Sequence, residues 1–122
     1  LDTARALGAQ GETEKETRDS LDYTVHEKGD WQAATNVLDT IGINAKTFPP
    51  DVLAGLKSHF IAGWGGYPLV GTKEQIIDGL HTLSRMGLDG VLLSWPRYLD
   101  GMKQFRDVTY PLLRQSGLRD ML

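Results

Sequence analysis

The last sixty or so residues of the chain alternate strand, helix, strand, helix with very short connections, and this pattern constrains the fold most. The run 90–94 (GVLLS) is continuously apolar, as is typical of a parallel strand covered on both faces. A very short predicted strand, Leu69 and Val70, precedes it. The alternation predicts an α/β protein with a parallel sheet, closed into a barrel or doubly wound. In both architectures ligands bind in the loops at the carboxyl ends of the strands.

Two helices complete this pattern. Thr72 to Gln75 form a capping box, and the helix behind them has one apolar stripe and ends at Gly87. Pro96 ends the second strand. The final helix is predicted to carry one apolar side and to end at Gly117; that side consists of Leu99, Met102, Phe105, Thr109, Leu112 and Leu113.

The first half of the chain reads as helical, except for residues 1–11, which fit a short buried strand or a fraying helix. A capping box at Thr13 predicts a helix to about Glu27. Asp30 is placed to cap a second helix that ends at Gly42. The Pro49–Pro50 pair starts a third, short helix, predicted to end near Ser58, before a glycine and aromatic loop over 63–68.

Composition narrows the possible functions. The 122 residues carry a net charge of −3 and no cluster of Lys and Arg, which argues against nucleic acid or an anionic membrane as a partner. No apolar run approaches the roughly 20 residues of a membrane span. The absence of cysteine excludes disulfides and thiolate metal sites and fits a cytoplasmic protein. The three histidines stand on different predicted elements, so we expect no metal site.

The segment 60–113 resembles the C-terminal end of the bacterial luciferase-like, flavin-dependent monooxygenases. The resemblance rests on the step PLVGTKEQ and the strand GLDGVLLSWP, and it covers most of residues 12–116. The region with Gly29–Asp30–Trp31 and Phe48–Pro49–Pro50 is similar to the insertion in the dimethylsulfone and pyrimidine monooxygenase branches, and the alkanesulfonate branch is also similar.

The resemblance implies a TIM (β/α)8 barrel of which this chain holds the C-terminal βα units. A complete barrel needs about 250 residues, so the barrel is incomplete in this chain. We expect residues 1–122 to form a single partial domain, with a helical insertion over 12–58 and a closing βαβα unit over 59–122. The implied activity is insertion of one oxygen atom of dioxygen into a small organic substrate, with sulfur-containing compounds among the candidates. The cofactor would be reduced FMN, supplied by a separate flavin reductase.

Three groups of residues are candidates for the walls of a flavin or substrate pocket, and each also has a purely structural interpretation. Trp95 directly follows a predicted parallel strand, where its ring can border a flavin or pack on the last helix. The loop residues Trp64, Gly65, Gly66 and Tyr67 can approach a ligand closely or simply turn the chain. Arg97 can hold an anionic substrate group or be an ordinary surface arginine. The Thr72 helix start is more simply a cap than an anion site. No catalytic residue is identified.

Two other hypotheses remain open from the sequence. The chain can be a non-catalytic assembly or dimerisation module that does not bind flavin alone, or part of a different barrel enzyme with the same closing unit. Under the leading hypothesis the chain by itself is expected to be inactive, and a homo-oligomer would bury its open sheet edge.

Overall fold

Three parallel strands form one sheet in this computed structural model, which describes residues 3–119. The central strand is β1 (Thr3–Gln10), flanked by β2 (Tyr67–Gly71) and β3 (Gly90–Ser94) in the order β2-β1-β3. Ala6 pairs with Tyr67 on one side and with Leu93 on the other. The strand interpretation of residues 1–11 is therefore correct over 3–10, while residues 1 and 2 lie outside the described residues.

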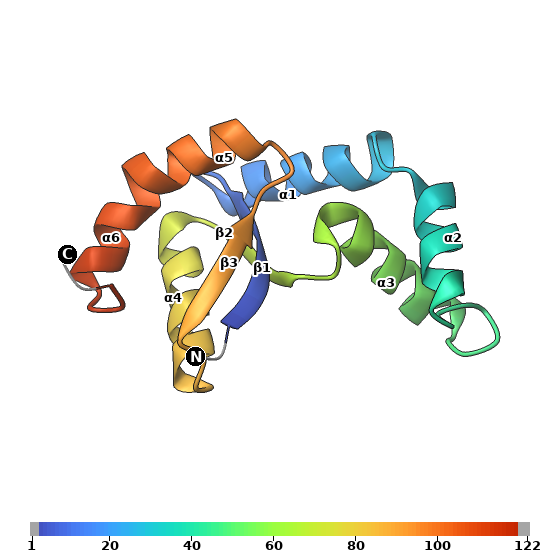
Figure 1. Cartoon of the computed structure of the whole chain (residues 1–122). Coiled ribbons are helices and arrows are strands. Elements are labelled where there is room, and N and C mark those ends of the chain that lie inside the picture. The colour runs from blue at the N-terminus through green and yellow to red at the C-terminus, as the bar shows by residue number, and fades with distance from the viewer. Residues whose placement is uncertain (1–2, 120–122) are drawn as a thin grey trace.

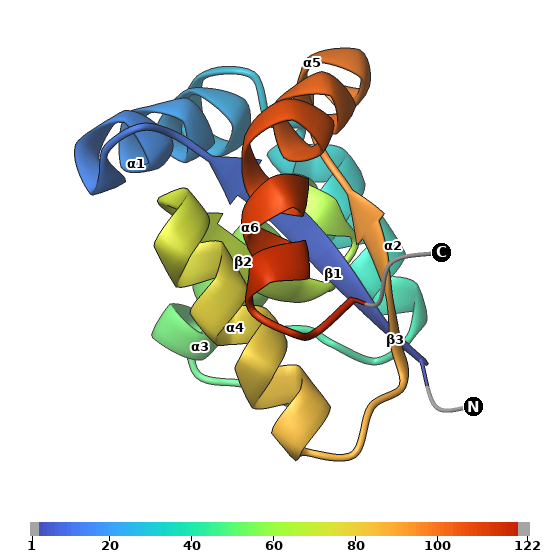
Figure 2. The same cartoon turned by 90° about the vertical axis from the view of Figure 1, so that its left-hand side faces the viewer.

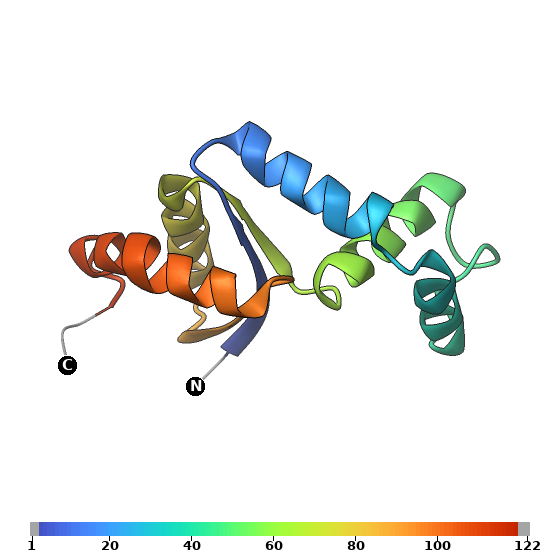
Figure 3. The ribbon, with the colours of Figure 1, turned by 90° about the horizontal axis from the view of Figure 1, so that it is seen from above.

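The strand order places helices on both faces of the sheet. From β1 the chain moves sideways to β2, and from β2 it returns across β1 to β3. Because crossovers between parallel strands are right-handed, this reversal puts the two sets of helices on opposite faces. Figure 3 shows α1, α2 and α3 on one side and α4 and α6 on the other.

The first set of helices comprises α1 (Glu14–Asp22), the π-helical turn η1 (Tyr23–Glu27), α2 (Trp31–Thr40) and α3 (Pro50–Gly63). The second comprises α4 (Lys73–Arg85), α5 (Tyr98–Gln104), the π-helical turn η2 (Phe105–Thr109) and α6 (Tyr110–Gln115).

The main core lies between the sheet and α4, with α6 packed beside α4 (Figure 2). Ala6 and Leu69 present their side chains to this face because alternate residues of a strand point to the same side. The stripe of α4 meets them with Ile76, Ile77 and Leu80. Each of the larger side chains contributes about 1.5–3 kcal/mol through burial, so this layer fixes the sheet to α4.

The predicted helix signals are confirmed. The Thr72 hydroxyl accepts from the Gln75 amide at 3.4 Å, and the Gln75 side chain accepts from the Thr72 amide at 2.9 Å. Asp30 caps α2 by accepting from the Ala33 amide at 2.8 Å. Thr13 caps α1, although the Glu16 carboxylate reaches back to the Glu12 amide instead of that of Thr13. None of the described helices is long and apolar enough to cross a membrane.

The predicted end of the third helix near Ser58 is wrong. Helix α3 runs to Gly63, because no residue between Ser58 and Ala62 interrupts the backbone hydrogen bonds. Its C-cap is Trp64, with a positive φ of 56° and its amide bonded to the Phe60 carbonyl at 2.8 Å. The predicted loop over 63–68 therefore shrinks to 64–66, and the following strand already begins at Tyr67.

The expectation that 90–94 is covered on both faces is also wrong. Helices α4 and α6 cover the face that carries Val91 and Leu93, while Leu92 on the other face is 57% exposed. β3 is an edge strand in the described part of the chain, and no described element covers the face that carries Leu92.

Candidate functional site

The carboxyl ends of the strands form the candidate site. Helices α1 and α5 leave the sheet at the same edge, α1 after β1 and α5 after β3 (Figure 1). The chain then turns to one face after β1 and to the other face after β3. In parallel α/β sheets, such a reversal between neighbouring strands opens a crevice in which ligands bind.

Two adjoining hollows occupy this edge, and we call them together the carboxyl-edge crevice. The first, of about 210 Å³, lies between the ends of β1 and β3 and is bordered by Trp95, Arg97 and α1. The second, of about 380 Å³, lies between the end of β1 and the start of α4. Gln10 and Gln104 line both hollows, so the two form one continuous surface.

Trp95 is held between two glycines at the wall of the first hollow. A Cβ added to Gly8 of β1 would lie 2.3 Å from the indole Nε1, and one added to Gly101 of α5 would lie 2.3 Å from Cγ. On a further side the ring meets Phe105, with centroids 5.8 Å apart. The predicted contact of Trp95 with the last helix is thus present, and the ring also borders the crevice. The two interpretations of Trp95 are compatible.

Arg97 lies at the rim of the same hollow. Its side chain is 82% exposed, and its guanidinium pairs with the Asp100 carboxylate at 3.0 Å. A guanidinium has five N–H donors, so this ion pair leaves donors for a further acceptor. Arg97 is therefore placed where it can meet an anionic group that enters the crevice.

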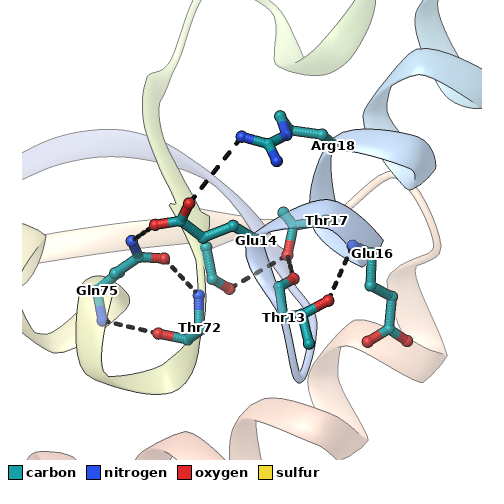
Figure 4. Close-up of polar contacts among 8 residues, drawn as sticks. Thr13, Glu14, Glu16, Thr17, Arg18, Thr72 and Gln75 are labelled. Carbon is teal, nitrogen blue, oxygen red and sulfur yellow. Dashed lines mark hydrogen bonds and ion pairs between the residues drawn. The ribbon is translucent and has the colours of Figure 1, made fainter.

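A network of side chains joins α1 to the start of α4 beside the crevice (Figure 4). Gln75 donates to the Glu14 carboxylate, which also lies 4.0 Å from Arg18. The buried Thr17 hydroxyl lies within hydrogen-bond distance of the Gly71 and Thr13 carbonyls, at 3.4 and 3.2 Å. The residues that cap α4 therefore have a structural role here, which agrees with the prediction that Thr72 is a helix cap and not an anion site. These contacts fix the loop after β1 relative to the loop after β2.

The predicted loop residues lie elsewhere. Trp64, Gly65, Gly66 and Tyr67 stand at the amino end of β2, and none of them lines the carboxyl-edge crevice. Trp64 is 71% exposed and meets Phe60 edge to face at 4.9 Å. The structure thus brings Trp95 and Arg97 together and leaves the 64–67 group apart from them.

Sequence reasoning missed Gln10 and its partner. Gln10 ends β1, and its side-chain oxygen accepts a hydrogen bond from the hydroxyl of Thr109, which is fully buried on η2. The only sequence signal was a threonine on the apolar side of the predicted last helix. This bond holds Gln10 at the point where the two hollows meet.

The crevice offers hydrogen-bonding and charged groups but no arrangement typical of nucleophilic catalysis. Its polar side chains include Gln10, Glu16, Ser20, Thr24 and Gln104. Among residues 3–119 no group of three His, Asp or Glu side chains could hold a metal ion. These side chains can bind and orient a ligand through hydrogen bonds and charge.

Comparison with known proteins identifies a structural neighbour. No protein-family model and no curated protein sequence matches the chain. Among solved structures, the crystal structure of riboflavin lyase (RcaE) with modified FMN and the substrate riboflavin matches with a TM-score of 0.74 at 20% identity. The match covers 98% of this chain and 32% of that protein, so this chain spans about a third of the neighbour's length. This likeness confirms the predicted fold class, an α/β unit that forms part of a larger TIM-barrel-like fold.

Proposed function

We propose that this chain is the C-terminal part of an FMN-dependent, two-component monooxygenase of the luciferase-like kind, and that its carboxyl-edge crevice forms one wall of the flavin site. The observation that carries the proposal is the position of Trp95 and Arg97 directly after β3, in a hollow beside the carboxyl end of β1, in a fold whose solved neighbour carries modified FMN. Open sheets with the strand order 2-1-3 also bind FMN between strands 1 and 3 in flavodoxin, which supports this location by fold-level analogy.

The size of the crevice supports a partial site. Pockets for drug-sized ligands measure roughly 300–1,000 Å³ and enclose most of the ligand. The hollow beside Trp95 measures about 210 Å³ and lies open to one side, so it fits one edge of a flavin. The remaining contacts would come from the part of the fold for which this chain has no counterpart.

Each crevice residue has a role in this proposal. The Trp95 ring, immobilised by Gly8 and Gly101, would border the flavin ring and exclude water from it. Arg97 would donate to the flavin phosphate or to an anionic group of the substrate. Gln10, fixed by Thr109, would donate or accept a hydrogen bond at the ring edge. When bound, reduced FMN supplies the oxygen-transfer chemistry; its supply by a separate flavin reductase belongs to the same proposal.

A titration with FMN tests the proposal, with flavin fluorescence as the readout. Because the chain supplies one wall only, we expect a dissociation constant on the order of 1 mM. Trp95→Leu should weaken binding about two- to tenfold, the effect of losing one aromatic contact. Trp64→Leu is the matched control, an exposed tryptophan outside the crevice, and should leave binding unchanged. Equal loss in both variants, or no binding at all, would contradict the proposed site.

A non-catalytic assembly module is the second candidate function. The specific observation in its favour is that both β2 and β3 are edge strands in the described part of the chain. An exposed edge offers unpaired backbone groups to another strand. This candidate predicts self-association without flavin binding.

A further inference from the structure

Thr109 differs from other helical threonines of the chain in where its hydroxyl donates. Threonine hydroxyls within helices commonly donate to the carbonyl four residues before. Thr24, Thr35 and Thr82 do so here, at 2.9, 2.8 and 3.0 Å. Thr109 instead donates across to the side-chain oxygen of Gln10, at the end of β1. Because Thr109 is fully buried, this oxygen is the acceptor that satisfies its hydroxyl.

The π-helical turn η2 accounts for the direction of this hydroxyl. In η2 the Tyr110 amide donates to the carbonyl of Phe105, which lies four residues before Thr109. The carbonyl that a helical threonine would ordinarily use therefore already has a partner. π-helical turns within helices occur frequently at functional sites. Here the turn directs Thr109 to the end of the central strand.

The bond to Thr109 decides which atom of Gln10 faces the crevice. A side-chain amide has one oxygen, which accepts, and one nitrogen, which carries two N–H donors. The Gln10 oxygen is occupied by Thr109, and the Gln10 nitrogen donates to no residue among 3–119. Gln10 lines both hollows of the crevice. The amide therefore offers donors, and not an acceptor, where the two hollows meet.

A second unpaired donor, the indole N–H of Trp95, lies beside this amide. Alternate residues of a strand point to the same face, so Gly8 and Gln10 share a face and lie about 7 Å apart along β1. The indole Nε1 lies 2.3 Å from the position of the Cβ that Gly8 lacks. This N–H has no acceptor in the described part of the chain, and Trp95 and Gln10 line the same hollow of about 210 Å³.

The acidic groups of this hollow are already engaged. One carboxylate oxygen of Glu16 accepts from the Glu12 amide at 2.9 Å. The Asp100 carboxylate pairs with Arg97 at 3.0 Å. The groups left for a ligand between the ends of β1 and β3 are therefore mainly N–H donors, and their complement is an oxygen acceptor.

We propose that Thr109 orients Gln10 so that its amide, together with the Trp95 indole, donates hydrogen bonds to an oxygen acceptor of the ligand in the crevice. This inference rests on the proposed function and extends it, because the acceptor is then an oxygen of the flavin, on a ring carbonyl or on the phosphate. Thr109 acts through Gln10 and is a positioning residue.

Side-chain proton exchange in the flavin-free chain, followed by NMR, tests the orientation of Gln10. We expect the buried Thr109 hydroxyl proton to exchange slowly and the Gln10 NH2 protons to exchange rapidly. Thr109→Val should shift the Gln10 NH2 resonances, whereas Thr109→Ser, which keeps the hydroxyl, should leave them near their original positions. The opposite exchange pattern, or Gln10 resonances unmoved by Thr109→Val, overturns the inference whether or not flavin binds.

Titration with riboflavin tests the donors without the charge of a phosphate. Gln10→Glu can still accept from Thr109 but has no N–H, so we expect it to weaken riboflavin binding about two- to tenfold, the effect of losing one hydrogen bond. Thr109→Val should weaken binding by a smaller factor, and Thr109→Ser should restore it. Gln115→Glu, at an exposed position of α6 outside the crevice, is the matched control and should leave binding unchanged.

The same titration with FMN identifies the source of the acceptor. Equal losses for riboflavin and FMN support a ring carbonyl, while a loss with FMN alone, repeated in the uncharged variant Gln10→Met, supports the phosphate. If both flavins bind Gln10→Glu as tightly as the unmodified chain, this inference is overturned and the proposed function stands. If neither flavin binds to the unmodified chain, the proposed function and the donor role of Gln10 both fail.

Discussion

Replacing Gly101 by alanine tests how firmly Trp95 is held at the crevice. Gly101 lies within α5, where alanine is favoured over glycine by about 1 kcal/mol. The added Cβ, however, would lie 2.3 Å from Cγ and 2.6 Å from Cβ of Trp95. Forcing an extra carbon into such a contact typically costs about 1–3 kcal/mol. The two effects together leave Gly101→Ala neutral to about 2 kcal/mol less stable than the unmodified chain.

Gly55→Ala is the matched control for this substitution. Gly55 also lies within a helix, α3, and a Cβ there meets nothing within 4 Å. Only the helix effect remains, so this variant should be about 1 kcal/mol more stable, which raises the melting temperature by about 4 °C for a chain of this size. The two glycine variants should therefore differ by about 1–3 kcal/mol in the free energy of unfolding, measured by urea denaturation followed by circular dichroism.

A double variant assigns the difference to the indole. Trp95→Ala removes the contacts of the added carbon with Cγ and Cδ1 of Trp95 and leaves only the contact with Cβ, so the cost of Gly101→Ala should fall in that background and the two changes should be strongly non-additive. If Gly101→Ala proves as stabilising as Gly55→Ala, the indole is not packed against α5. The description of Trp95 as a fixed wall of the crevice would then be wrong.

Three further predictions concern other parts of the chain. Thr72→Ala removes the cap of α4 and should lower the free energy of unfolding by about 1 kcal/mol, whereas Thr82→Ala within the same helix should change it much less; equal losses would contradict the capping geometry. His59→Phe should leave stability unchanged or raise it by about 1 kcal/mol, because the His59 Nε2 atom is buried without a hydrogen-bond partner in the described structure; a loss above about 2 kcal/mol would show that it has one. The hydrogen bond and charge of Arg106 lower the pKa of Asp107, so the stabilisation that this pair gives the folded state is present above the ordinary pKa of an aspartate and is lost as pH falls through the lowered pKa; NMR titration of Asp107 should show its pKa raised in Arg106→Gln, and an unchanged pKa would contradict the pairing.

Local signals predicted most of the helices because they act over three or four residues. Thr13, Asp30 and Thr72 each bond to amides within the next turn, and these bonds depend on little else. The end of α3 was missed because glycine at position 63 reads equally as loop or as the last helical residue. There the positive φ is adopted by the following tryptophan, which has a side chain that disfavours it.

The strand order could not be predicted in the same way. The insertion of β1 between β2 and β3 depends on pairings across 60 to 90 residues, which no local pattern encodes. For the same reason Trp95 and Arg97 were placed together from their closeness in sequence, while the contact between Gln10 and Thr109 was not foreseen. The burial of 90–94 was overestimated because an apolar run cannot show which of its faces a partner covers.

The most direct test of the central claim is NMR mapping of FMN on the chain. With FMN added to millimolar concentration, we predict chemical-shift changes at the Trp95 indole N–H and at the backbone amides of residues 8–12, 95 and 97–101. The amides of residues 64–67 should not shift. Changes confined to 64–67, or no change in either segment, would contradict the claim that the carboxyl-edge crevice forms one wall of a flavin site.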